Sequence, residues 1–102
     1  MISVAKKLSD DIRTSLENRL ADKYKTIFQT DDYKCLCYDG KVFFRISEHE
    51  WIGTNDVVIL TEYADSEFEA RKGLFGEDGE MFYIEEMTED EIFDAIVSEI
   101  EA

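Results

Sequence analysis

The dipeptide Asp39-Gly40, with an apolar segment on each side, places the strongest constraint on the fold of this chain. Residues 33–38 (Tyr-Lys-Cys-Leu-Cys-Tyr) and 41–46 (Lys-Val-Phe-Phe-Arg-Ile) are rich in aromatic and β-branched residues, which favour strands. Asp-Gly favours a two-residue type I′ turn, because both central residues of that turn need positive φ. The segment therefore predicts a β-hairpin, with Cys35 opposite Phe44 and Cys37 opposite Val42.

This register divides the predicted hairpin into two faces, because residues directly opposite each other point the same way. The predicted core face carries Tyr33, Cys35, Cys37, Val42, Phe44 and Ile46. The second face is basic and aromatic, and it carries Lys34, Leu36, Tyr38, Lys41, Phe43 and Arg45.

Apolar periodicity and capping patterns predict the remaining elements. Apolar residues recur every three or four positions in an amphipathic helix over residues 2–24, and residues 27–28 either extend it or begin a strand. Ser66 and Thr88 each begin a capping-box pattern, the first for a short helix and the second for a final helix. The segments between are predicted as a loop at 47–55, a central strand at 57–63, a turn at 76–79 and a short strand at 81–84.

The predicted order, α-β-β-β-α-β-α, indicates an α+β fold with a mainly antiparallel four-stranded sheet packed by helices. The chain has 102 residues, no proline and five glycines, so we expect one domain over residues 1–102. No apolar run approaches the ~20 residues that a membrane span requires. Cys35 and Cys37 alternate along one strand, which disfavours a disulfide, and no secretion signal is present. These features predict a cytoplasmic protein that does not bind a membrane.

The charge of the chain is extreme and unevenly distributed. Residues 1–25 carry six basic and four acidic side chains, whereas residues 62–102 carry 15 acidic side chains against only Arg71 and Lys72. With a net charge of −14, the chain repels nucleic acid and attracts basic proteins. We therefore expect no direct binding of nucleic acid. The alternative is that the acidic residues only keep a small domain soluble.

No catalytic or metal-binding motif is present. His49 is the single histidine, so a His-Glu-x-x-His zinc site cannot form. The acidic segments at residues 31–32 and 77–80 lack the alternating oxygen ligands of an EF-hand. A cysteine on a core-facing strand offers neither a cleft nor a neighbouring base. The sequence predicts a protein that is not an enzyme and holds no metal or cofactor.

The leading hypothesis is an interaction protein that binds and inhibits a basic partner through its acidic C-terminal half, as a monomer or a homodimer. Acidic residues four apart on a helix stand ~6 Å apart, which is comparable with phosphate spacing in DNA. In general character, though in no motif, such a chain resembles phage-encoded anti-restriction or anti-CRISPR inhibitors and bacterial toxin-immunity proteins. The predicted contact residues are Glu77, Asp78, Glu80, Glu85, Glu86, Glu89, Asp90, Asp94 and Trp51.

Two further interpretations remain open from sequence. Trp51 either anchors a partner or covers an edge of the core. The chain is also compatible with a secretion-chaperone-like or adaptor module, which would bind peptide through the hydrophobic sheet residues Leu36, Tyr38 and Phe43.

Overall fold

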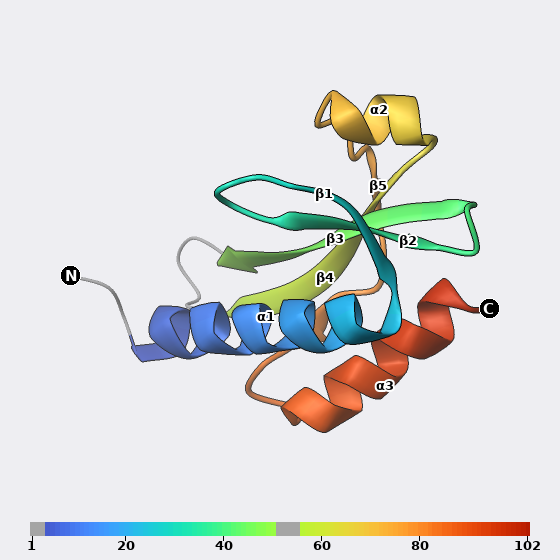
Figure 1. Cartoon of the computed structure of the whole chain (residues 1–102). Coiled ribbons are helices and arrows are strands. Elements are labelled where there is room, and N and C mark those ends of the chain that lie inside the picture. Colours follow the sequence, from blue (N-terminus) through green and yellow to red (C-terminus); the bar gives the residue numbers. More distant parts are fainter. Residues whose placement is uncertain (1–3, 51–55) are drawn as a thin grey trace.

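A twisted sheet lies between two helical layers in the computed structural model, which describes residues 4–50 and 56–102. Helices α1 (Val4–Lys23) and α3 (Glu89–Ile100) cover one face of the sheet, and the short helix α2 (Glu67–Arg71) lies over the other (Figure 1). The predicted α+β class and mainly antiparallel sheet are confirmed.

The sheet contains more strands than the sequence predicts. Its order is β1-β2-β3-β4-β5, with β6 also paired to β4, and every pairing is antiparallel. Residues 27–28 lie in the edge strand β1, so the strand alternative is correct. The predicted turn at 76–79 contains β5, and β3 runs into the predicted loop. The strands are β1 (Lys25–Gln29), β2 (Lys34–Tyr38), β3 (Val42–Glu50), β4 (Val57–Ala64), β5 (Glu77–Asp78) and β6 (Phe82–Tyr83).

The β2–β3 hairpin has the predicted turn but not the predicted register. Asp39 and Gly40 have φ of 55° and 66°, and the Lys41 amide donates to the Tyr38 carbonyl over 3.0 Å. The ladder, however, resumes with Val42 opposite Tyr38. Lys41 is therefore one extra residue on the β3 side, as in a β-bulge, and it shifts the pairing by one position.

This shift overturns the predicted division of the hairpin into faces. Leu36 lies opposite Phe44, and Cys37 lies opposite Phe43. Leu36 consequently enters the core with Phe44, whereas the two cysteines share the second face with Phe43. The predicted basic and aromatic face is therefore wrong, because Leu36 and Tyr38 lie on the side of the main core and Phe43 lies in the second layer.

Two apolar layers result, one on each side of the sheet. The main core lies beneath α1 and α3 and consists of Leu16, Leu20, Tyr24, Leu36, Phe44, Ile46, Ile59, Phe82, Ile92, Ile96 and Ile100. The second, smaller layer lies toward α2 and consists of Cys35, Cys37, Phe43, Ala64, Ala70 and Phe75. Both cysteines are buried and free.

The predicted capping box is complete at α3, and at α2 the structure shows its serine half. At α3, the Thr88 side chain accepts from the Glu91 amide while the Glu91 carboxylate accepts from the Thr88 amide, which completes the predicted capping box. At α2, the Ser66 hydroxyl accepts from the Glu69 amide. Among the described residues, no helix is both long and apolar enough to cross a membrane.

The β2–β3 turn gives a direct test of backbone strain. Gly40→Ala should lower the free energy of unfolding by about 1 kcal/mol, because an L-residue is disfavoured at positive φ although the site has space for a methyl group. The matched control is Gly76→Ala, which also has open space but no positive φ. Urea denaturation should therefore give an unchanged or slightly higher stability for the control. Equal losses in the two variants would contradict the turn geometry.

The buried thiol of Cys35 predicts a loss of stability at alkaline pH. Burial raises the pKa of this thiol from 9.0 to about 11. Because the unfolded chain releases this proton near pH 9 and the folded chain retains it, the free energy of unfolding should fall as pH rises from 9 to 11, by about 2 kcal/mol in total.

Denaturation of wild type and Cys35→Ala at steps between pH 8 and 10 would measure this effect, with a shallower fall expected for the variant. The comparison ends at pH 10 because burial also raises the pKa of Tyr24 and Tyr63 above the ordinary 10.0. Identical slopes for the two proteins would rule out the Cys35 contribution.

Candidate functional site

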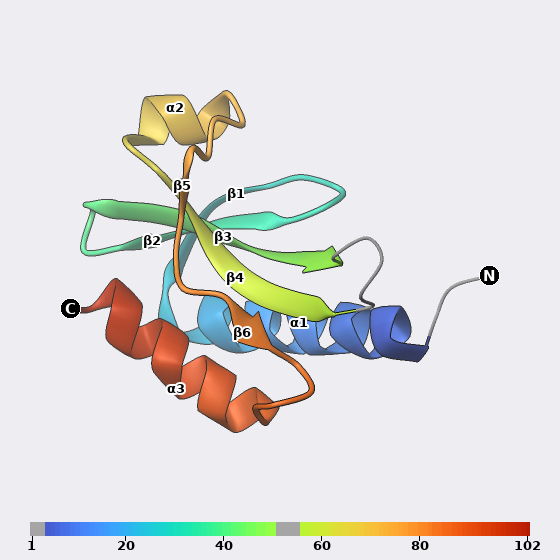
Figure 2. The same cartoon turned by 180° about the vertical axis from the view of Figure 1, so that it is seen from behind.

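The carboxylates predicted to bind a partner lie on β5, on the segments around β6 and on α3. Residues 73–102 contain eleven acidic residues and no lysine, arginine or histidine. Figure 2 shows β5, β6 and α3 along the same side of the molecule. We call this surface the acidic face and define it by Glu77, Asp78, Glu80, Glu85, Glu86, Glu89, Asp90, Glu91 and Asp94.

Sheet pairing and the apolar side of α3 hold this face in place. Asp78 pairs with Glu62 of β4, and Phe82 pairs with Ile59. On α3, Ile92, Ile96 and Ile100 are buried in the main core. The helical period then leaves Glu91 and Asp94 on the exposed side.

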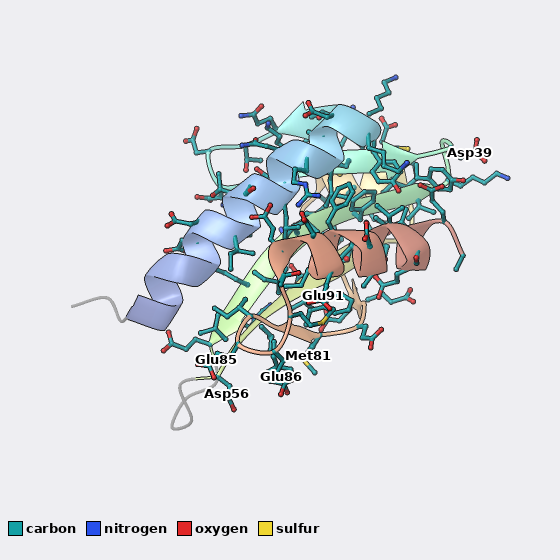
Figure 3. The ribbon with its side chains drawn as sticks, turned by 90° about the horizontal axis from the view of Figure 1, so that it is seen from below. Asp39, Asp56, Met81, Glu85, Glu86 and Glu91 are labelled. Carbon is teal, nitrogen blue, oxygen red and sulfur yellow. The ribbon has the colours of Figure 1, made fainter. Side chains whose placement is uncertain are left out.

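One end of the acidic face combines carboxylates with an exposed apolar side chain. In Figure 3, Glu85, Glu86 and Met81 lie close together, near Asp56 and at the opposite end of the molecule from Asp39 in the hairpin turn. Met81 is 45% exposed and, with Phe68 and Leu74, is one of the exposed large apolar side chains among the described residues. A partner surface would therefore meet both charge and an apolar contact at this end.

Two of the predicted contact residues are already paired within the chain. Arg19 of α1 donates to Glu89 and to Asp90, each over 2.9 Å, and its guanidinium lies 4.2 Å from the centre of the Phe93 ring. Ser15 also donates to Glu89 over 2.8 Å. The bond to Glu89 raises the pKa of Arg19. Glu89 and Asp90 thus hold α3 against α1, and their charges are partly neutralised.

The remaining predicted carboxylates face solvent. Glu77, Asp78, Glu80, Glu85, Glu86 and Asp94 are exposed. Trp51 lies outside the described residues, so both interpretations of it stay predictions.

Sequence reasoning missed two tyrosine–carboxylate contacts at the C-terminal end of α3. The Tyr63 hydroxyl of β4 donates to Glu99, and the Tyr24 hydroxyl donates to Glu101. The Glu80 amide donates to the same Glu99 carboxylate over 2.7 Å. The residues of each pair are far apart in the sequence, so no local pattern indicates them.

A further polar cluster surrounds His49 on β3 and includes Glu62 of β4. Ser47 Oγ lies 3.2 Å from Nε2 of His49, and Glu62 Oε2 lies 4.0 Å from the same nitrogen. In a nucleophilic triad, the serine and the acid contact different nitrogens of the imidazole. Because both groups meet Nε2 here, the cluster lacks that arrangement, although a groove of about 380 Å³ adjoins it.

Comparisons of the chain with protein-family models, curated proteins and solved structures found no match. Among the described residues, the acidic face is the most pronounced concentration of charge.

The contact between α1 and α3 can be tested by double-mutant cycles. The coupling free energy between Arg19 and Glu89 should be about 1 kcal/mol, because the pair is partly buried and the guanidinium also contacts Phe93. Urea denaturation of Arg19→Met, Glu89→Gln and the double variant would measure it.

The matched control is the more exposed pair Arg71–Glu67 on α2, at 2.9 Å, for which we expect about 0.3 kcal/mol. A coupling for Arg19–Glu89 no larger than this control would contradict a structural role for the contact.

Proposed function

We propose that this chain is a non-enzymatic acidic protein that binds a basic, nucleic-acid-binding partner and inhibits it by occupying the surface that otherwise holds phosphates. One observation carries the proposal. The acidic face presents exposed carboxylates from three consecutive segments, and residues 73–102 themselves contain no basic side chain.

Charge and apolar contact have different roles under this proposal. The summed field of the carboxylates accelerates encounter with a positively charged groove. Affinity then depends on desolvated contacts at the centre of the interface, for which the exposed Met81 is the candidate. A solubility role alone requires a negative charge but no particular position for it, so position is the property to test.

The adaptor alternative depends on three residues that the fold does not present together on an exposed surface. Leu36 is fully buried in the main core, Phe43 lies in the second apolar layer, and Tyr38 packs against the main core. Leu36 and Tyr38 therefore lie on the side of α1 and α3, whereas Phe43 lies on the side of α2, so the three residues do not form one sheet face that a peptide could contact.

The test reverses three charges on the acidic face, in the variant Glu85→Lys, Glu86→Lys, Asp94→Lys. These side chains are exposed, so the fold should be retained. Immobilised wild-type chain would first capture its partner from host lysate at low salt. The purified partner would then be tested for binding of labelled DNA and RNA in the presence of each variant.

Wild type should displace the nucleic acid from the partner, and its affinity for the partner should fall steeply as salt rises. It should bind the partner at least about tenfold more tightly than the reversed variant does. The matched control, Asp11→Lys, Asp22→Lys, Asp31→Lys, makes the same change in net charge at exposed positions outside the acidic face. Equal weakening by the control would mean that only net charge matters. A partner that retains its nucleic acid would contradict inhibition by occupancy.

A further inference from the structure

A hollow of about 470 Å³ opens beside the acidic face, between the start of β3, the end of β4, β5 and the end of α3. Its lining combines apolar and aromatic side chains with carboxylates. The residues that matter here are Val42, Phe43, Tyr63, Glu77, Asp78 and Glu99.

Tyr63 connects the two kinds of lining. Glu77 lies directly opposite Tyr63 in the β4–β5 ladder, and the Tyr63 hydroxyl donates to Glu99. Gly79 allows this arrangement, because a Cβ at that position would fall 2.8 Å from Cδ of Glu99. The lining of the hollow therefore combines the Tyr63 side chain with Glu77, its partner in the ladder, and Glu99, which accepts from its hydroxyl.

The chain uses the same combination for arginines of its own, of which Arg45 and Arg19 are two examples. The Arg45 guanidinium lies 4.7 Å from the Tyr33 ring centre and 4.3 Å from that of Phe75, and its Nε donates to Glu62 over 3.0 Å. Arg19 lies over Phe93 and donates to Glu89 and Asp90. In both places a ring and a carboxylate hold one guanidinium.

The hollow offers this combination without an arginine of the described chain in its lining. Its basic lining residue is Lys41, which is 80% exposed and lies 3.8 Å from Asp39 at the rim. We infer that the hollow accepts an arginine side chain of the basic partner, and this inference rests on the proposed function.

Arginine suits the hollow better than lysine does. A planar guanidinium stacks on aromatic faces and pairs with carboxylates through two parallel hydrogen bonds. The lysine ammonium is a compact, strongly hydrated charge that gains less from apolar walls. The hollow therefore gives the acidic face a preference for arginine over lysine, in addition to its preference for positive charge.

The test is an NMR titration of the full chain with N-acetylarginine methylamide, compared with N-acetyllysine methylamide and spermidine. The arginine probe should shift the backbone amides of Val42, Phe43, Ala64 and Gly79 most strongly, and bind at least about threefold more tightly than the lysine probe.

Two variants with equal loss of charge localise the effect. Glu77→Gln, Asp78→Asn should weaken the arginine probe about tenfold, because it removes the carboxylates of β5 from the hollow. The affinity for the arginine probe should be unchanged in the second variant, Glu85→Gln, Glu86→Gln. The inference would be overturned if the three cations bound equally well, if the shifts spread along the acidic face, or if no shift were detectable. Equal weakening of the arginine probe in the two variants would also overturn it.

This outcome is separable from that of the proposed function. Displacement of nucleic acid by the acidic face, together with no preference for the arginine probe, would remove the arginine site and leave the inhibitor. A localised arginine site in a chain that displaces no nucleic acid would retain the site and remove the inhibitor.

Discussion

The register between β2 and β3 decides which side chains enter each of the two apolar layers. Because Lys41 is left out of the ladder, Leu36 and Phe44 face the main core while Cys37 and Phe43 face the second layer. The acidic face depends on the same sheet, since β5 and β6 pair with β4 and α3 packs on the main core. A one-residue change in that register would turn the side chains of β2 to the opposite faces, which would move Leu36 out of the main core and bring Cys35 and Cys37 into it.

The acidic residues of this chain divide into two groups with different physical roles. Glu17 is buried and accepts from the Lys34 amide over 3.0 Å and from Arg13 over 3.3 Å, so it attaches α1 to β2. Glu62 and Glu89 hold Arg45 and Arg19. These three inner carboxylates bind Arg13, Arg45 and Arg19, which are three of the eleven basic residues of the chain. The field that a partner meets therefore comes from the outer carboxylates of β5, the β6 segments and α3, where no basic side chain lies nearby in the sequence.

Sequence patterns were reliable where the controlling interaction was local. The Asp39-Gly40 turn, the Thr88–Glu91 capping box and the buried stripe of Ile92, Ile96 and Ile100 all depend on residues a few positions apart. The patterns were insufficient for β1 and β5. The first contains a bulge at residue 27 and the second has only two residues, so neither leaves the alternation that marks a strand. Arg19 and Glu89 are 70 residues apart, and no local signal relates them.

The sequence by itself determined the α+β class, the helix starts, the hairpin turn and the concentration of negative charge in the C-terminal half, because each follows from local conformational preference or composition. Only the tertiary structure decided the hairpin register, the division of the carboxylates into paired and exposed groups, and the meeting of Tyr63, Glu77 and Glu99 in one hollow. Those features depend on which distant segments pack together, and packing is settled by the burial of two apolar layers at once rather than by any short stretch of chain.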